Sequence, residues 1–217
     1  MTSMHVWTDT FLVLLVILNL SLLGSSRLGA ATRRVAAQGI LLGLFTLVLH
    51  MDRLTIETVA MTAGMIGLKG IVFPWLLFRA LREAEVRREV EPYVGYSASL
   101  LFGVLAFGLS LWLGSRLPLP GGQEVSLIVP AGLFTILVGL FLIVARRKAL
   151  NQVLGYLVLE NGIYAFGVAL LPERPLLVEL GILLDVFVGV FVMGIMIFHI
   201  QREFDHIDAD RLSSLKD

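Results

Sequence analysis

Long apolar stretches dominate this amino-acid sequence and constrain its fold more than any other feature. A helix that crosses the roughly 30 Å hydrocarbon core of a bilayer needs about 20 mostly apolar residues. Seven stretches approach this pattern, at residues 6–23, 35–51, 55–78, 94–114, 125–144, 151–171 and 175–198. The sequence therefore predicts an all-α, polytopic membrane protein with seven transmembrane helices in contact with the lipid bilayer.

The composition excludes several classes of function. The 217 residues are 57% hydrophobic and 16% charged, and their formal net charge is zero, so no overall basic field attracts a nucleic-acid backbone. The absence of cysteine excludes disulfides, iron–sulfur ligation and cysteine nucleophiles. The sequence also has no GxGxxG, phosphate-loop or nucleophile motif. We expect no nucleic-acid partner, no catalytic residue, and no metal or cofactor bound by this chain.

The distribution of basic residues predicts the orientation in the membrane. Connections on one side of the predicted spans, together with the C-terminal tail, hold 13 Lys and Arg residues, whereas the opposite side holds three. By the positive-inside rule, the N-terminus is outside and the C-terminus is cytoplasmic. We therefore expect a multi-pass protein of the cell inner (cytoplasmic) membrane.

The predicted spans also suggest how the chain is divided. The turn that contains Pro118, Pro120, Gly121 and Gly122 separates a four-span bundle, residues 1–117, from a three-span module with a cytoplasmic tail, residues 118–217. The charged segment 79–93 is either a cytoplasmic docking surface or a solvated linker.

Three ionisable residues lie near the middle of predicted spans, namely Lys69, Glu160 and Asp185. A charge at the centre of a helix that faces lipid costs about 2.5–3.5 kcal/mol, so these side chains should face the protein interior. The gap at 172–174 predicts a tight hairpin that places Glu160 and Asp185 at about the same depth. We expect these two acids to form one unit, and we expect Lys69 to lie near a carboxylate or polar chain of a partner subunit.

Buried acids and lysines are suited to proton transfer, because burial moves the pKa of both groups toward neutral pH. The sequence favours a proton relay through Glu160, Asp185 and Lys69 over a static pair that merely joins helices. Neighbouring residues support this prediction. Tyr156 and Tyr164 share a helix face with Glu160 at four-residue spacing, and Asn161 adjoins it.

Other polar features have simpler explanations. Glu57 and Glu179 fall in the first turns of their predicted helices, where the helix dipole stabilises an acid without any functional role. Pro74 cannot donate a hydrogen bond to the carbonyl of Gly70, which leaves an acceptor beside Lys69 or simply a helix kink.

The later part of the chain resembles a known family. The runs RRKALNQVLGYLVLENGIYAFG, PLLVELGILLDVFVGVFVMGIM and DADRLSSLKD are similar to the C-terminal half of the E subunit of hydrogenase 4, a membrane-arm component of group 4 [NiFe] hydrogenase and formate hydrogenlyase complexes. The last three predicted spans also resemble, more distantly, the K-type subunit of respiratory complex I and the C-type subunit of multisubunit cation/proton antiporters.

The resemblance implies a place in a chain of polar residues that runs along a membrane arm. Asp185 and Gly189 match the second acid of the K-type subunit and the glycine that follows it. The position of the first acid aligns with Leu157, one helical turn before Glu160. Antiporter-like and complex I-like subunits are implied as partners, with a soluble hydrogenase module that holds the [NiFe] centre and the iron–sulfur clusters.

We therefore expect a subunit of a complex I-like hydrogenase that contributes to the translocation of protons or sodium ions, coupled to redox chemistry in its partners. Two alternatives remain open. One is an autonomous secondary transporter, and the other is a purely structural spacer between antiporter-like subunits.

Overall fold

The computed structural model describes residues 2–49, 55–83, 92–117 and 127–170, together with residues 188, 189, 192 and 194. The regular elements within the four ranges are all helical. They are α1 (Thr2–Leu23), α2 (Leu28–Leu49), α3 (Ile56–Gly67), the π-helix η2 (Leu68–Val72), α4 (Phe73–Glu83), α5 (Tyr96–Arg116), α6 (Ile128–Ala145) and α7 (Ala149–Leu170).

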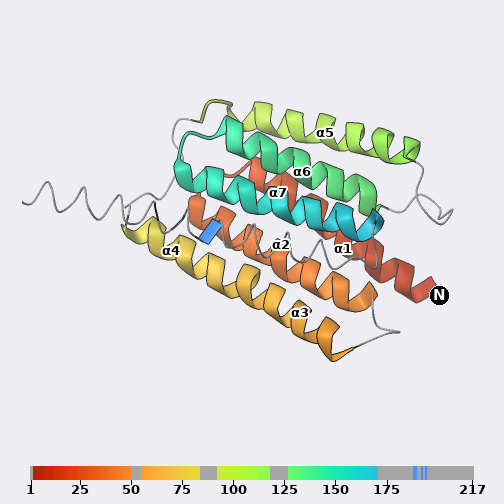
Figure 1. Cartoon of the computed structure of the whole chain (residues 1–217). Helices are drawn as coiled ribbons and strands as arrows, with labels where there is room; N and C mark the ends of the chain where they lie inside the picture. The colour runs from red at the N-terminus through yellow and green to blue at the C-terminus, as the bar shows by residue number, and fades with distance from the viewer. Residues whose placement is uncertain are drawn as a thin grey trace, which may run out of the picture.

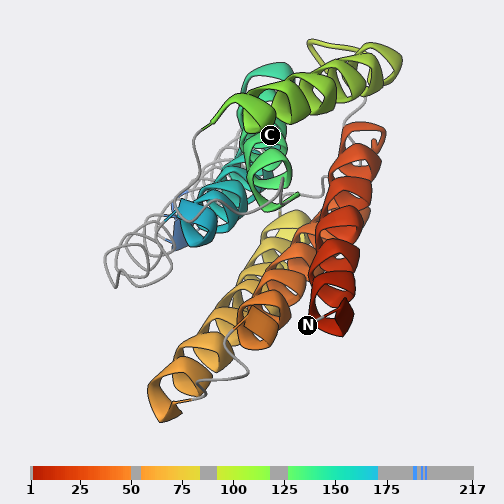
Figure 2. The ribbon, with the colours of Figure 1, turned by 90° about the vertical axis from the view of Figure 1, so that its right-hand side faces the viewer.

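The long helices pack as an antiparallel bundle (Figure 1). α3, η2 and α4 continue one another as a single rod, so the described ranges contain six long helical segments. The turned view shows two groups of helices, with α1 to α4 in one and α5 to α7 in the other (Figure 2). α1 packs against α5 and α6, and α2 packs against α7, so these contacts join the groups.

Glycines set the closest packing among the described helices, between α6 and α7. A Cβ atom at Gly139 would overlap the backbone of Leu159, and one at Gly162 would lie 2.5 Å from the backbone nitrogen of Ile136. Small residues let two membrane helices bring their backbones together. α7, which carries Glu160, is therefore held firmly against α6.

The third predicted span is a helix interrupted by the π-helix η2. Within η2 the hydrogen bonds lengthen by one residue, and the N–H of Phe73 donates to the carbonyl of Leu68. Proline follows at position 74 and supplies no N–H to the preceding turn. Such π segments insert one extra residue into a helix and occur frequently at functional sites. Lys69 is the second residue of this segment.

The length and apolar composition of the helices indicate a membrane protein. Within the part of the chain that the structure describes, four segments are long and apolar enough to cross a bilayer: Leu28–Leu49, Thr62–Arg82, Tyr96–Arg116 and Ile128–Ala145. The segment Trp7–Leu23 of α1 is also apolar. α7 has the predicted position and carries polar residues along its length. Seven spans and their orientation stay predictions.

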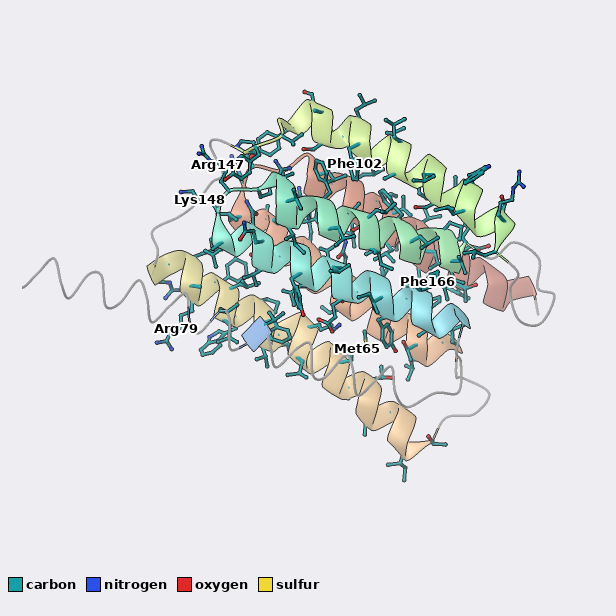
Figure 3. The ribbon with its side chains drawn as sticks, turned by 45° about the horizontal axis from the view of Figure 1, so that its top comes forward. Met65, Arg79, Phe102, Arg147, Lys148 and Phe166 are labelled. Carbon is teal, nitrogen blue, oxygen red and sulfur yellow. The ribbon has the colours of Figure 1, made fainter. Side chains whose placement is uncertain are left out.

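The ends of the helices differ from the predicted spans in one informative place. α2 begins at Leu28 rather than at residue 35 and includes Arg33 and Arg34 in its first two turns. Alanine and arginine are strong helix formers, so the helix continues past the end of the apolar stretch. Arg79, Arg147 and Lys148 lie at one end of the bundle (Figure 3).

Several predictions fall outside the described residues. These are the boundary at 118, most of the charged segment 79–93 and most of the seventh predicted span. Of that span, Val188 and Val192 are buried in the main apolar core. A Cβ atom at Gly189 would lie 4.0 Å from the ring of Phe73 on α4.

Candidate functional site

An ion pair lies in the interior of the bundle, between η2 and α7. The ammonium nitrogen Nζ of Lys69 donates to the carboxylate oxygen Oε1 of Glu160 at 2.6 Å. Lys69 is 7% exposed and Glu160 only 2%, so protein surrounds both groups. In a medium of low polarity a close pair of opposite charges stabilises both charged forms and offers a short path for a proton.

Asn161 adds a second acceptor for the lysine. Its Oδ1 atom lies 3.3 Å from Nζ of Lys69, and its side chain is 1% exposed. Glycine on α2 makes this arrangement possible, because a Cβ atom at Gly39 would lie 2.5 Å from the Cβ of Lys69. The backbone of η2 can therefore approach α2 closely, and Lys69 then extends past it to α7.

The structure gives Lys69 a carboxylate from its own chain, Glu160. The expected carboxylate or polar chain of a partner subunit stays a prediction. Spacing along the sequence could not reveal this pairing, since the two residues are 91 positions apart. Their similar predicted depth was the only signal available.

The tyrosines that share a face with Glu160 have different surroundings. The hydroxyl of Tyr164 forms a hydrogen bond of 2.8 Å with the hydroxyl of Thr46, which joins α7 to α2. Tyr156 is half-buried and packs against the main apolar core. Tyr164 thus acts in a contact between α7 and α2.

Three predicted site residues remain: Asp185, Glu179 and Glu57. Asp185 and Glu179 lie outside the described residues, so the pairing of Asp185 with Glu160 stays a prediction. Glu57 is the second residue of α3, as its predicted position in a first turn requires.

A second buried polar cluster was missed by sequence reasoning. Asn19 on α1 donates to Thr135 on α6 at 2.8 Å, and Gln38 on α2 donates to Asn19 at 2.9 Å. All three side chains are completely buried. The available signal was an uncharged amide within each of two apolar spans, and we had considered only ionisable groups.

Arg146 is a second buried cation that the charge count assigned to a loop. It is 2% exposed, and its guanidinium donates to the carbonyls of Leu23 at 2.9 Å and Val94 at 3.2 Å. It also lies 4.7 Å above the ring of Tyr96. Arg146 therefore joins the end of α1 and the start of α5 to the turn between α6 and α7 by hydrogen bonds.

Comparison with known proteins gives relatives but no template. No protein-family model matches the chain, and no solved structure matches it. The chain is 37% identical over 101 residues to "Hydrogenase-4 component E" of Escherichia coli, and the match spans 46% of each protein. The protein of the same description in Shigella flexneri matches with the same identity over the same length.

A longer match is found to a mycobacterial protein. The chain is 34% identical over 195 residues to "Uncharacterized protein Rv0085" of Mycobacterium tuberculosis, and the match spans 88% of this chain and 87% of that protein. The chain therefore belongs to the same protein family as this mycobacterial protein and has a partial relationship to component E of hydrogenase 4.

Proposed function

We propose that this chain is a multi-pass subunit of the inner-membrane arm of a hydrogenase-4-like complex, and that it contributes the pair Lys69–Glu160 to a path for protons. The ion pair carries the proposal, because it places two exchangeable groups 2.6 Å apart inside apolar helices. Intramembrane ionisable residues are costly, and they commonly mark ion pathways or proton relays.

The partial similarity to component E of hydrogenase 4 supports the setting. In this proposal, antiporter-like and complex I-like membrane subunits flank the chain, and a soluble module performs the redox chemistry on its [NiFe] centre and iron–sulfur clusters. Asp185 continues the path beyond Glu160. The position of Gly189 beside Phe73 supports this extension, since Phe73 lies four residues after Lys69.

A structural clamp is the second candidate, because the same ion pair joins η2 to α7. The two candidates predict different results when both charges are removed together. Replacement of a buried ion pair by apolar side chains of similar volume is often neutral or stabilising. A clamp therefore tolerates the double substitution Lys69→Met with Glu160→Leu, whereas a proton path does not.

The test is proton movement coupled to turnover, measured in inverted membrane vesicles that contain the complete complex. We expect the double variant to accumulate and assemble at the parental level and to lose proton movement. Thr46→Val is the matched control, since it breaks the contact with Tyr164 between α2 and α7 without removing a charge. Parental proton movement in the double variant would reject the path and leave the clamp.

The proposed orientation has its own test, because the chain has no native cysteine. A single cysteine at Gly121 should react with an impermeant thiol reagent from the outer side, and one at Arg147 from the cytoplasmic side. The opposite pattern would overturn the proposed topology.

A further inference from the structure

A small cavity adjoins Lys69 of the ion pair. The residues that line it come from α2, η2, α4 and α7, and they include Thr32, Ala36, Lys69, Pro74, Leu157 and Asn161. About 10 Å³ of this space is open to a water molecule, close to the roughly 10–15 Å³ that one water requires. The cavity is therefore large enough for one water.

The polar groups around the cavity fit a water ligand. A lysine ammonium has three hydrogens to donate, and the described residues provide two acceptors, Glu160 and Asn161. Asn161 uses its Oδ1 atom for Lys69, which leaves its amide hydrogens to donate elsewhere. The hydroxyl of Thr32 donates to the carbonyl of Leu28 at 3.0 Å and keeps its own lone pairs as acceptors.

Pro74 leaves a further acceptor available, the backbone carbonyl of Lys69. In the i→i+5 register of a π-helix, the N–H of residue 74 would bond to the carbonyl of Lys69, but proline has no N–H. A buried water needs about two to four polar partners. The ammonium, the amide, the hydroxyl and this carbonyl meet that requirement.

The helix positions that line the cavity show on which side of the ion pair it lies. Thr32 lies four residues after the start of α2, about 6 Å along the helix. Leu157 precedes Glu160 by three residues toward the start of α7, and Pro74 follows Lys69 toward the end of α4. These helix ends adjoin the predicted basic, cytoplasmic connections. The cavity thus lies on the predicted cytoplasmic side of the ion pair.

From this geometry we infer that the cavity is a binding site for a single water, through which Lys69 exchanges its proton with the cytoplasmic side. The inference rests on the proposed function for its direction of transfer. The Lys69 ammonium passes a proton to the Glu160 carboxylate and becomes an amine. The bound water, protonated from the cytoplasmic side, then returns a proton to the amine and is left as neutral water.

Hydroxyl-radical footprinting by X-ray radiolysis of the complete complex in native membranes tests this site. Radicals form from local water, so they modify buried side chains that adjoin a bound water. Phe73 and Leu157 line the cavity, whereas Phe45 and Leu42 are comparably buried and do not. We expect modification of Phe73 and Leu157 to exceed that of Phe45 and Leu42.

A matched pair of variants locates the water. Ala36→Leu fills the cavity, whereas Ala37→Leu adds the same side chain one residue away, at a position that does not line it. We expect the modification of Phe73 to fall to the level of Phe45 in the first variant and to persist in the second. Equal modification of Phe73 and Phe45 in the unaltered chain would overturn the inference, whether or not the variants assemble.

Persistence of the Phe73 modification in an assembled Ala36→Leu complex would also overturn it. Footprinting reports water regardless of turnover. A dry cavity would therefore reject this water site and leave the proposed proton path standing, and loss of the path in vesicles would leave the footprint unchanged.

Discussion

Two buried cations in this chain, Lys69 and Arg146, have opposite kinds of surroundings. Lys69 lies within a helical rod and contacts a carboxylate and an amide. Arg146 lies in a turn and contacts backbone carbonyls and an aromatic ring. Both side chains are more than 90% buried. Burial alone therefore does not distinguish their roles.

The chemistry of the partners does distinguish them. Arginine does not lose its proton in proteins, and neutral carbonyls cannot take one, so Arg146 is suited to holding helix ends together. A lysine beside a carboxylate has both a proton to give and an acceptor to receive it. The comparison assigns a structural role to Arg146 and the exchangeable role to Lys69.

The largest effect on stability is expected from Glu160→Leu alone, since it leaves Lys69 without its counter-charge. Removal of one member of a buried pair typically costs about 3–5 kcal/mol. Thermal unfolding of the solubilised complex measures this change.

The double variant Lys69→Met with Glu160→Leu is the control, because it leaves no unpaired buried charge, and its unfolding temperature should lie near the parental value. Equal unfolding temperatures for Glu160→Leu and the double variant would contradict the role of Glu160 as the counter-charge of Lys69.

A loss in the same range is expected from Arg146→Met. The substitution leaves the carbonyls of Leu23 and Val94 without their donor, and each buried acceptor left without a partner costs about 1–3 kcal/mol. Unfolding temperature is the measurement, and a parental value would contradict the structural role of Arg146.

The smallest effect is expected from Arg147→Met, one residue further along. Arg147 is exposed and contacts the ring of Tyr93 at 5.1 Å. A cation–π contact at an exposed site contributes about 0.5–1 kcal/mol. An unfolding temperature close to the parental value would show that the effect at Arg146 depends on its buried contacts; equal losses at both positions would contradict this.

The sequence predicted the helices well, because a helix depends on the order of apolar residues along a local stretch. Helices occupy the positions predicted for the first six spans, and four segments have the length and composition of membrane spans. The start of α2 was placed too late, because the helix extends through Arg33 and Arg34 to Leu28. The π-helix at Lys69 was not predicted, although Pro74 indicated a local irregularity.

The candidate site was predicted residue by residue but not as a contact. Lys69, Glu160 and Asn161 stood out because polar groups are rare within apolar stretches, and that is a local property of the sequence. Their meeting depends on the close approach of η2 to α2 at Gly39 and on the packing of α6 against α7. Arg146 appeared in the sequence as an ordinary loop charge, because nothing local shows that Leu23 and Val94 surround it. The sequence by itself determined which residues are costly to bury. Only the tertiary structure decided which of these residues contact one another, since contacts between distant helices follow from packing.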